Sequence, residues 1–436
     1  MSNTPLLPLN RRQFVTSVGG LAALAAAAGT SSAFAKAARP PVGRRPRIAL
    51  LATEVRRLSH AQHFVDRFLE GYSWLGQHHR SDLELVSLYV EQFPEGDLAH
   101  DRVRRHGVKL CATILETLTL GGSSLAVDGV VIIGEHGLYA RNSRGQTLYP
   151  RYRYFREMTQ VFEVSRRSVP VFNDKHLSTD WRECVAMVET SRRLNFPFLA
   201  GSSLPVTWRF PALEIPLGTP LTESVSICYG GVDSYDFHGL ETAQCMSERR
   251  AGGETGIKSV QALRGEAVWQ LLQQKDTTRR LFFAALNRSF TYHAPDGFTF
   301  GEPSVEIARR FCDRPFAYVY EHLDGFRTTM FLLSGLVTDF TYAGLRTDTG
   351  EVYSCQMYLP MPMTTGTLAD FFSPLVHHIE NMVLTGQAPY PVERTLLTSG
   401  MTLFAVQSLY QGGIRIETPE LSVNYATPHD SHFWRA

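Results

Sequence analysis

The sequence predicts an α/β protein with a doubly wound parallel sheet in its N-terminal half and an α+β domain with an antiparallel sheet in its C-terminal half. Three observations support this fold class. The 436 residues are 44% hydrophobic and 19% charged, which suits a water-soluble globular protein of about two or three domains. From Arg47 to Ala200, short apolar runs alternate with segments of helical spacing. After Pro211, strand-like segments separated by turns dominate.

Residues 1–35 have the form of a twin-arginine export signal. Arg11 and Arg12 precede an apolar, alanine-rich stretch, and Ala33-Phe34-Ala35 supplies the small residues that a signal peptidase accepts. The stretch is too short and too weakly apolar for a membrane span, so we expect no membrane association after processing. The sequence therefore predicts a periplasmic protein exported by the twin-arginine translocase. Residues 36–46, rich in proline and arginine, then form a linker.

Residues 47–210 alternate strands and helices as a doubly wound domain does. Continuous apolar runs are typical of strands in a parallel sheet that helices cover on both faces. The predicted strands are Arg47–Ala52, Leu83–Val90, Val108–Cys111, Val127–Ile133, Ser168–Phe172 and Phe196–Ala200. The predicted helices are His60–Leu75, Thr113–Leu120, Tyr154–Arg166 and Trp181–Leu194.

Residues 211–425 are expected to form the second domain, with residues 426–436 as an exposed tail. The predicted strands are Ser224–Tyr229, Ala317–His322, Thr328–Leu333, Phe340–Leu345 and Glu351–Leu359, with a hairpin turn at Thr347–Gly350. The predicted helices are Val260–Gln273, Leu368–Thr385 and Glu393–Tyr410.

The charge balance and the cysteines exclude several classes of protein. Lys and Arg number 43 against 42 Asp and Glu, so no general attraction to nucleic acid or to an anionic membrane is expected. The six cysteines include no C-x-x-C pair, which argues against a zinc ribbon or a redox dithiol and favours buried free thiols. A small molecule is the expected partner, and the sequence leaves a homo-oligomer open.

The predicted parallel strands end in polar residues. Such sheets bind ligands beyond the carboxyl ends of their strands, so these residues are the first candidates for a site. They are Thr53-Glu54, Glu91-Gln92, Glu135-His136, Asp174-Lys175-His176 and Ser202-Ser203.

Three segments resemble the Gfo/Idh/MocA family of sugar-directed oxidoreductases. Pro170 to His176 is similar to the family's Glu-Lys-Pro segment at the fifth strand, with Asp174 for the glutamate and His176 for the proline. Gly230-Gly231 and Phe237 to Glu241 resemble the glycine-rich strand and the start of the helix that carries the catalytic histidine. Ile379 to Gly386 and Glu393 to Leu409 resemble the closing helices. The resemblance implies a Rossmann-like domain, an open antiparallel sheet and a nicotinamide cofactor, NAD or NADP.

The family's glycine-rich fingerprint after the first strand is missing. After Ala52 the chain continues with Thr53-Glu54-Val55-Arg56-Arg57, which lacks the glycines that let a backbone approach a pyrophosphate. Glu54 would repel phosphate, and Arg56 or Arg57 would offset it. We therefore expect any dinucleotide to bind weakly or in an altered pose.

The predicted catalytic residues are Lys175, His238 and Asp174. A lysine directly after a buried strand is partly desolvated, and Asp174 beside it tunes its pKa toward proton transfer. An imidazole at a helix start is kept neutral by the helix dipole, which suits a general base. In the resembling family, the lysine contacts the substrate hydroxyl and the nicotinamide ribose. The alternatives are a surface lysine paired with Asp174 and a histidine that packs against its own helix.

Cofactor and substrate residues follow from position. Glu91, at the end of the second strand, is placed to hold a ribose hydroxyl and would favour NAD over NADP. The full set of predicted cofactor-binding residues is Thr53, Glu91, Glu135 and His136. The predicted substrate-binding residues are His176, Trp208, Arg209 and Asp236, which combine an aromatic platform with hydrogen-bonding groups.

These features predict an exported oxidoreductase that acts on a sugar or cyclitol-like substrate. No metal is expected; the alternative is a divalent metal held by His136, Asp174, His176, Asp236 and His238. Two other functions stay open, a lyase, epimerase or hydrolase on the same scaffold and a carbohydrate-binding protein without activity.

Overall fold

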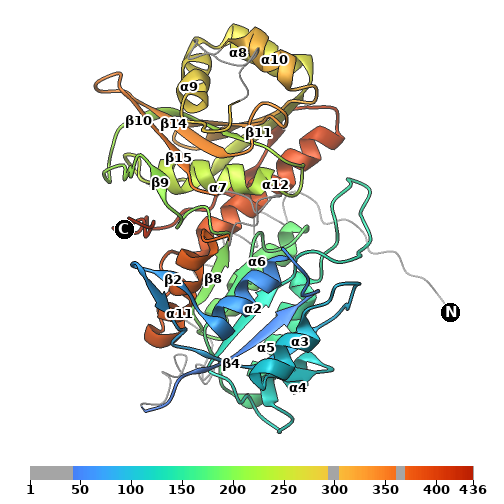
Figure 1. The fold of residues 1–436 in the computed structure, drawn as a ribbon. Helices are drawn as coiled ribbons and strands as arrows, with labels where there is room; N and C mark the ends of the chain where they lie inside the picture. The colour runs from blue at the N-terminus through green and yellow to red at the C-terminus, as the bar shows by residue number, and fades with distance from the viewer. Residues whose placement is uncertain (1–42, 293–303, 360–368, 436) are drawn as a thin grey trace, which may run out of the picture.

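The computed structural model describes residues 43–292, 304–359 and 369–435. Two halves are stacked, each built on one large sheet, and segments from near the C-terminus run back against the N-terminal half (Figure 1). The predicted export signal lies outside the described residues. Among the helices in the described ranges, none has the length and apolar character needed to span a bilayer.

The N-terminal sheet has six strands, all parallel, as the apolar runs predict. From edge to edge the strands are β5 (Lys109–Cys111), β4 (Glu84–Val90), β1 (Arg47–Ala52), β6 (Gly129–Ile133), β7 (Val171–Asp174) and β8 (Phe198–Gly201). The chain therefore moves outward from β1 in one direction and then in the other. This order is that of a doubly wound dinucleotide-binding fold, with its switch point between β1 and β6.

Both faces of this sheet are covered, because successive strand residues point to opposite sides. Ile48 and Leu50 belong to one apolar core, together with residues of α2 (His60–Glu70) and α11 (Phe372–Thr385). Ala49 and Leu51 belong to a second core. The helices of that second face are α4 (Ile114–Thr119), α5 (Arg151–Ser165) and α6 (Trp181–Arg193). A further helix that the sequence analysis missed is α3 (Ala99–His106).

The predicted helix His60–Leu75 is too long at its C-terminal end. It stops at Glu70, because Gly71 has a φ of 92° and a side chain there would collide with the backbone carbonyl of His79. The chain then forms a hairpin of β2 (Tyr72–Trp74) and β3 (Gln77–His79).

The C-terminal sheet has eight strands and is mostly antiparallel, as predicted. In spatial order the strands are β16 (Ile416–Glu417), β11 (Ile257–Arg264), β12 (Phe316–His322), β13 (Arg327–Leu332), β10 (Leu221–Cys228), β14 (Phe340–Arg346), β15 (Val352–Met357) and β9 (Arg209–Phe210). Neighbours β10 and β13 are parallel, and the other neighbouring pairs are antiparallel.

The predicted helix Val260–Gln273 is wrong over its first part. Strand β11 extends to Arg264, Gly265 turns the chain with a φ of 60°, and α8 (Glu266–Gln274) follows. The apolar residues of β11 and of α8 together have the spacing of a single helix, so the sequence pattern predicted one helix across this junction.

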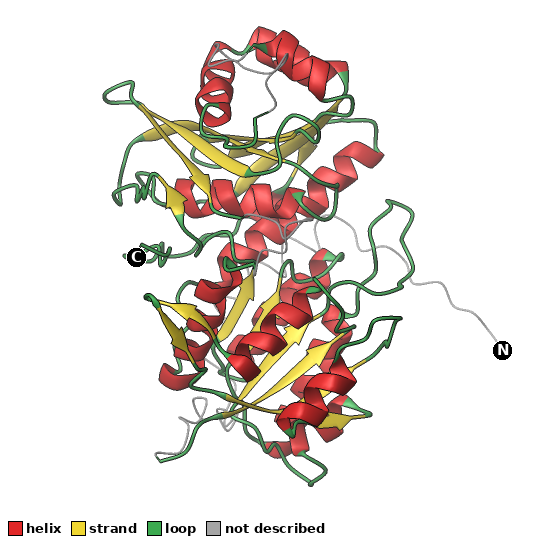
Figure 2. Cartoon of the chain, in the orientation of Figure 1, coloured by secondary structure: helices red, strands yellow, loops and turns green. Residues whose placement is uncertain are grey.

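Helices cover both faces of the C-terminal sheet (Figure 2). Helix α8, with α9 (Asp276–Leu286) and α10 (Val305–Phe311), lies on the outer face, and these helices share a core with β10 and β13. Helices α7 (Asp236–Ser247) and α12 (Val392–Tyr410) lie on the inner face, between the two sheets. Every residue of α7 is buried, which suits a helix packed between two layers. The six cysteines are buried free thiols, as predicted.

Candidate active site

A cavity of about 490 Å³ lies where the two halves meet. On the N-terminal side it is bounded by the residues that follow β6, β7 and β8 in the chain, which is where a doubly wound sheet binds its ligands. On the C-terminal side it is bounded by the start of α7 and by the turn before it. Phe371 and Phe372, at the start of α11, close it from a third direction.

Strained backbone is concentrated around this cavity. Leu58, His136, Lys175 and Asp233 all line it, and each has a positive φ, of 64°, 69°, 57° and 59°. A positive φ costs conformational free energy in residues other than glycine, and such residues are found together at functional sites. The strain supports the assignment of this cavity as the functional site.

Lys175 is buried and lies in an ion-pair network. Its Nζ is 3.2 Å from Oε2 of Glu135, and the other carboxylate oxygen of Glu135 accepts a hydrogen bond from Arg151. Burial lowers the pKa of Lys175, but the charges of Glu135 and Asp174 outweigh burial and raise it. Lys175 is therefore a fixed cation at the cavity wall.

Asp174 is not the ion-pair partner of Lys175, although the two are adjacent in sequence. Its Oδ2 lies 2.6 Å from Nδ1 of His60, the first residue of α2. Successive residues at the end of a strand point in different directions, so Lys175 instead meets the carboxylate of Glu135, which follows the neighbouring strand β6.

His238 is joined to a chain of buried polar groups. Its Nδ1 is 2.9 Å from Oγ of Ser202, and the Ser202 hydroxyl donates a hydrogen bond to Oε2 of Glu241. Since the hydroxyl gives its proton to Glu241, its oxygen accepts from His238, which places the ring proton on Nδ1. Nε2 is left without a proton, as a base needs. Burial, followed by the charge of Lys175, lowers the pKa of His238, so its ring is neutral.

The close approach of Glu241 depends on a glycine. A side chain at Gly201, the last residue of β8, would lie 2.5 Å from Oε1 of Glu241, and Gly201 has a φ of 120°. Burial raises the pKa of Glu241 to about 7. Ser202, Glu241 and His238 thus form a hydrogen-bonded chain that ends in a carboxyl group able to change protonation state near neutral pH.

Two other histidines of the cavity have polar atoms without protein partners. Nε2 of His176 lies 3.1 Å from Nη1 of Arg151 and accepts from it, which leaves a proton on the buried Nδ1. Nδ1 of His136 lies 3.4 Å from Nη2 of Arg56, and its Nε2 is likewise buried without a hydrogen bond. Burial lowers the pKa of both rings, to about 3 for His136. Each ring thus offers a neutral N–H to a ligand.

Two of the predicted cofactor-binding residues, Thr53 and Glu91, do not line the cavity. The Thr53 hydroxyl is buried and donates to the backbone carbonyl of Glu135. Glu91 accepts hydrogen bonds from Arg153 and from the hydroxyl of Tyr154, the latter at 2.5 Å. Glu135 and His136, the other two, do line the cavity.

Two hydrogen bonds join the segments on either side of the switch point of the parallel sheet. The Gln92 side chain, after β4, accepts from the backbone N–H of Leu138 at 2.9 Å and donates to its carbonyl at 3.2 Å. We call these two bonds the Gln92–Leu138 clasp. It joins the segments that follow β4 and β6 across the end of β1, where a dinucleotide runs in folds of this type.

Of the predicted substrate-binding residues, only His176 lines the cavity. Arg209 is 1% exposed, donates to the carbonyls of Pro205 and Leu213, and lies over the ring of Phe433. Trp208 packs against the rings of Tyr358 and Trp434. These two side chains secure the start of the second domain.

Asp236 is fully buried at the start of α7. Its carboxylate accepts from the backbone N–H groups of Asp233, Ser234 and Phe237 and from the hydroxyl of Tyr318. It holds the turn that presents His238 and does not reach a ligand.

The alternative metal set does not converge. Asp174 is bound to His60, His176 to Arg151, His238 to Ser202, and Asp236 to its own turn. Among the described residues, the His, Cys, Asp and Glu side chains that approach one another closely enough for a metal lie elsewhere.

Sequence reasoning missed Glu241 and His60 as parts of this site. Glu241 follows His238 by three residues on a helix, so the two share one face, and this spacing could have identified it. His60 meets Asp174 across 114 residues, a contact that no local pattern predicts.

No protein-family model and no curated protein matches the sequence. Among solved structures, GenD2 from gentamicin A biosynthesis, in complex with NAD, is similar with a TM-score of 0.53 at 11% identity, covering 87% of this chain and 98% of that one. The myo-inositol dehydrogenase of Lactobacillus casei, in complex with NAD(H) and myo-inositol, gives 0.53 at 10% identity, covering 89% and 99%. The myo-inositol dehydrogenase of Corynebacterium glutamicum gives 0.50 at 14% identity, covering 85% and 98%. At these identities the likeness shows a shared fold, the one that the sequence resemblance implies.

Proposed function

We propose that the protein is an oxidoreductase that acts on a hydroxyl group of a sugar or cyclitol-like substrate, with a nicotinamide cofactor. The observation that carries the proposal is that a cationic Lys175 and a neutral His238 line one cavity at the carboxyl edge of the parallel sheet. The similar solved structures include two named as myo-inositol dehydrogenases, one of them in complex with NAD(H) and myo-inositol.

Removal of the hydroxyl proton is assigned to His238. The substrate O–H bond breaks as a new N–H bond forms at Nε2, which is free because Nδ1 carries the ring proton toward Ser202. The ring is then doubly protonated, and its Nδ1 proton can pass through the Ser202 hydroxyl to Glu241. The buried side chains of His238, Ser202 and Glu241 thus take up the proton without opening the cavity to water.

Lys175 stabilises the oxygen that loses the proton. Its ammonium group is held in place by Glu135, which Arg151 fixes from the other side. A fixed cation in a buried site stabilises a developing alkoxide without the cost of reorienting water. Lys175 therefore acts as a hydrogen-bond donor and His238 as the base.

The cavity suits a ligand with many hydroxyl groups. The unpartnered N–H groups of His136 and His176 need acceptors, and buried donors without partners are costly. The Phe372 ring stacks on His63 at 4.8 Å and provides an apolar wall. Hydroxyl oxygens can accept from both imidazoles while the apolar face of a sugar ring lies against Phe372.

The nicotinamide end of a cofactor fits the cavity that Lys175 and His238 line. The adenosine end does not fit its usual position in dinucleotide-binding folds, beyond the end of β4. Glu135 and His136 would lie beside the nicotinamide, which when bound accepts a hydride from the substrate carbon. The Gln92–Leu138 clasp and the Arg153 bond to Glu91 occupy the path to the ribose position. Binding of the whole dinucleotide therefore requires the clasp to open.

The clasp also favours a second candidate function. A lyase or epimerase needs the same base and the same cation, and it needs no exchange of dinucleotide through the switch point. The two functions differ in whether substrate turnover consumes added nicotinamide cofactor.

The test is to denature the purified protein and identify released molecules by absorbance and mass, then to incubate the native protein with NAD, NADP and a panel of cyclitols and sugars. The proposal predicts nicotinamide reduction that depends on one of the polyols. Turnover of a polyol without any nicotinamide, bound or added, would instead establish the second candidate.

A further inference from the structure

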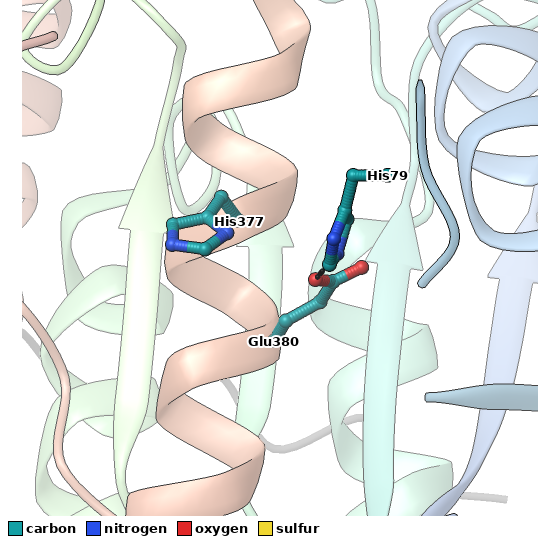
Figure 3. A group of neighbouring side chains, drawn as sticks. All are labelled: His79, His377 and Glu380. Carbon is teal, nitrogen blue, oxygen red and sulfur yellow. Dashed lines mark hydrogen bonds and ion pairs between the residues drawn. The ribbon is translucent and has the colours of Figure 1, made fainter. Parts of the chain in front are cut away.

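His79, His377 and Glu380 form a second polar cluster, and none of the three lines the active-site cavity. His79 is the last residue of β3, and the other two lie three residues apart on α11, so they share one helix face. Figure 3 shows the Glu380 side chain reaching from α11 to the His79 ring, with His377 on the same helix.

The three side chains bring their ligand atoms close together. Nε2 of His79 is 2.9 Å from Oε2 of Glu380, and the nearest ligand atoms of all three residues lie within 4.8 Å of one another. Zinc binds imidazole nitrogen and carboxylate oxygen at about 2.0–2.2 Å, so its ligands lie about 3.4 Å apart in tetrahedral geometry. A side-chain movement of at most about 1.4 Å would bring the three ligand atoms to this spacing.

Two buried atoms of the cluster have no hydrogen-bond partner. Oε1 of Glu380 is one, although the residue is only 1% exposed, and Nδ1 of His377 is the other. The described partners of this buried carboxylate, the His79 ring and the Tyr72 hydroxyl, both contact Oε2 and leave Oε1 without a hydrogen bond. A divalent cation between the groups would satisfy both orphaned atoms and neutralise the carboxylate.

The surroundings hold the ligands in place. The Tyr72 hydroxyl donates to Oε2 of Glu380 at 3.1 Å, and the Trp74 ring stacks on His377 at 4.2 Å between centroids. Such outer contacts fix the orientation of metal ligands and strengthen binding. His79 and His377 are partly exposed, which leaves a path for the ion and for a water molecule as a fourth ligand.

We propose that His79, His377 and Glu380 bind a divalent transition metal of the zinc class, separate from the active-site cavity. Two imidazoles and one carboxylate suit zinc, and calcium or magnesium would require more oxygen ligands. The ion would fasten the β2–β3 hairpin to α11, whose first turn closes the active-site cavity through Phe372. This proposal does not depend on the proposed function, and its test measures binding and stability.

The experiment titrates zinc into the chelator-treated protein and follows binding by calorimetry and the melting temperature. We expect one zinc ion per chain and a higher melting temperature with zinc, but no effect of magnesium. His377→Ala should weaken binding at least about tenfold, since it removes one of three ligands without disturbing a described hydrogen bond of its ring. Glu380→Gln should do the same, and His429→Ala, at an exposed position, should bind as the wild type does.

Two results would overturn the proposal. The first is an absence of zinc binding by the wild-type protein. The second is binding that His377→Ala leaves unchanged. Loss of that binding with His136→Ala would then assign the ion to the active-site cavity. Circular dichroism of each variant separates loss of the ion from loss of the fold.

Discussion

Glu241 should make the stability of the protein depend on pH in a direction opposite to that of an ordinary surface carboxyl. Its pKa is raised from 4.5 to about 7, chiefly because the side chain is buried beneath β8, and hydrogen bonds from Ser202 only partly oppose the rise. In the unfolded chain the same carboxyl ionises near its ordinary value. Between these two pKa values the folded protein therefore holds one proton more than the unfolded chain.

The sign and size of the effect follow from proton linkage. Stability falls as pH rises wherever the folded state binds more protons. The contribution is fully present below about pH 4.5 and is lost as the pH rises through about 7. One pKa unit corresponds to about 1.4 kcal/mol, so the shift from 4.5 to about 7 gives a full loss of about 3.5 kcal/mol.

Glu241→Gln removes the titrating group and keeps an oxygen that accepts from Ser202. We expect urea unfolding to show the wild type losing about 2.5 kcal/mol relative to this variant between about pH 5 and pH 8. Glu95→Gln, at an exposed position, controls for the loss of one carboxyl. A wild-type-to-variant difference that stays constant over this pH range would refute the assignment of a raised pKa, and with it the buried carboxyl as proton acceptor.

Gln92→Ala removes both hydrogen bonds of the clasp, each worth about 0.5–1.5 kcal/mol, so calorimetry should show NAD binding about tenfold tighter than in the wild type. Gln270→Ala, at an exposed position, is the control. Equal NAD affinities of Gln92→Ala and the wild type would contradict a closed adenosine position. Ser202→Ala removes the hydroxyl that fixes the tautomer of the His238 ring, and we expect kcat to fall about 10- to 100-fold with an altered pH profile. An unchanged pH profile would argue against proton transfer from His238 through Ser202 to Glu241. Replacing Arg11 and Arg12 by Lys should retain the protein in the cytoplasm in cell fractionation, and an unchanged periplasmic yield would defeat the twin-arginine proposal.

The parallel sheet was predictable because its strands are buried on both faces and are therefore continuously apolar. Arg47–Ala52 is a strand with the predicted bounds, and the helix predicted at Trp181–Leu194 ends one residue earlier. Two of the errors came where two elements meet at a glycine. Gly71 and Gly265 adopt positive φ angles that end one element and start another, and the apolar period runs across both.

The sequence was sufficient to predict which strand ends carry the residues of the candidate site. The polar residues after β6, β7 and β8 do meet at one cavity, because parallel strands present their carboxyl ends at the same edge. The pairing within the site was not predictable. Lys175 pairs with Glu135, which follows the neighbouring strand β6, and Asp174 pairs with His60 on α2, because contacts between elements depend on side-chain direction in the folded state.

The central claim is that Lys175 and His238 act together on one substrate hydroxyl. Its most direct test compares turnover of an identified polyol by the wild type, Lys175→Met, His238→Asn and the double variant, with Lys258→Met and His429→Asn as exposed controls. We expect each active-site change to lower kcat about 10²- to 10⁴-fold, and the double variant to be little worse. The melting temperature should change by only a few degrees, because Glu135 keeps Arg151 as a partner. Full turnover by either single variant, with the controls unaffected, would contradict the account.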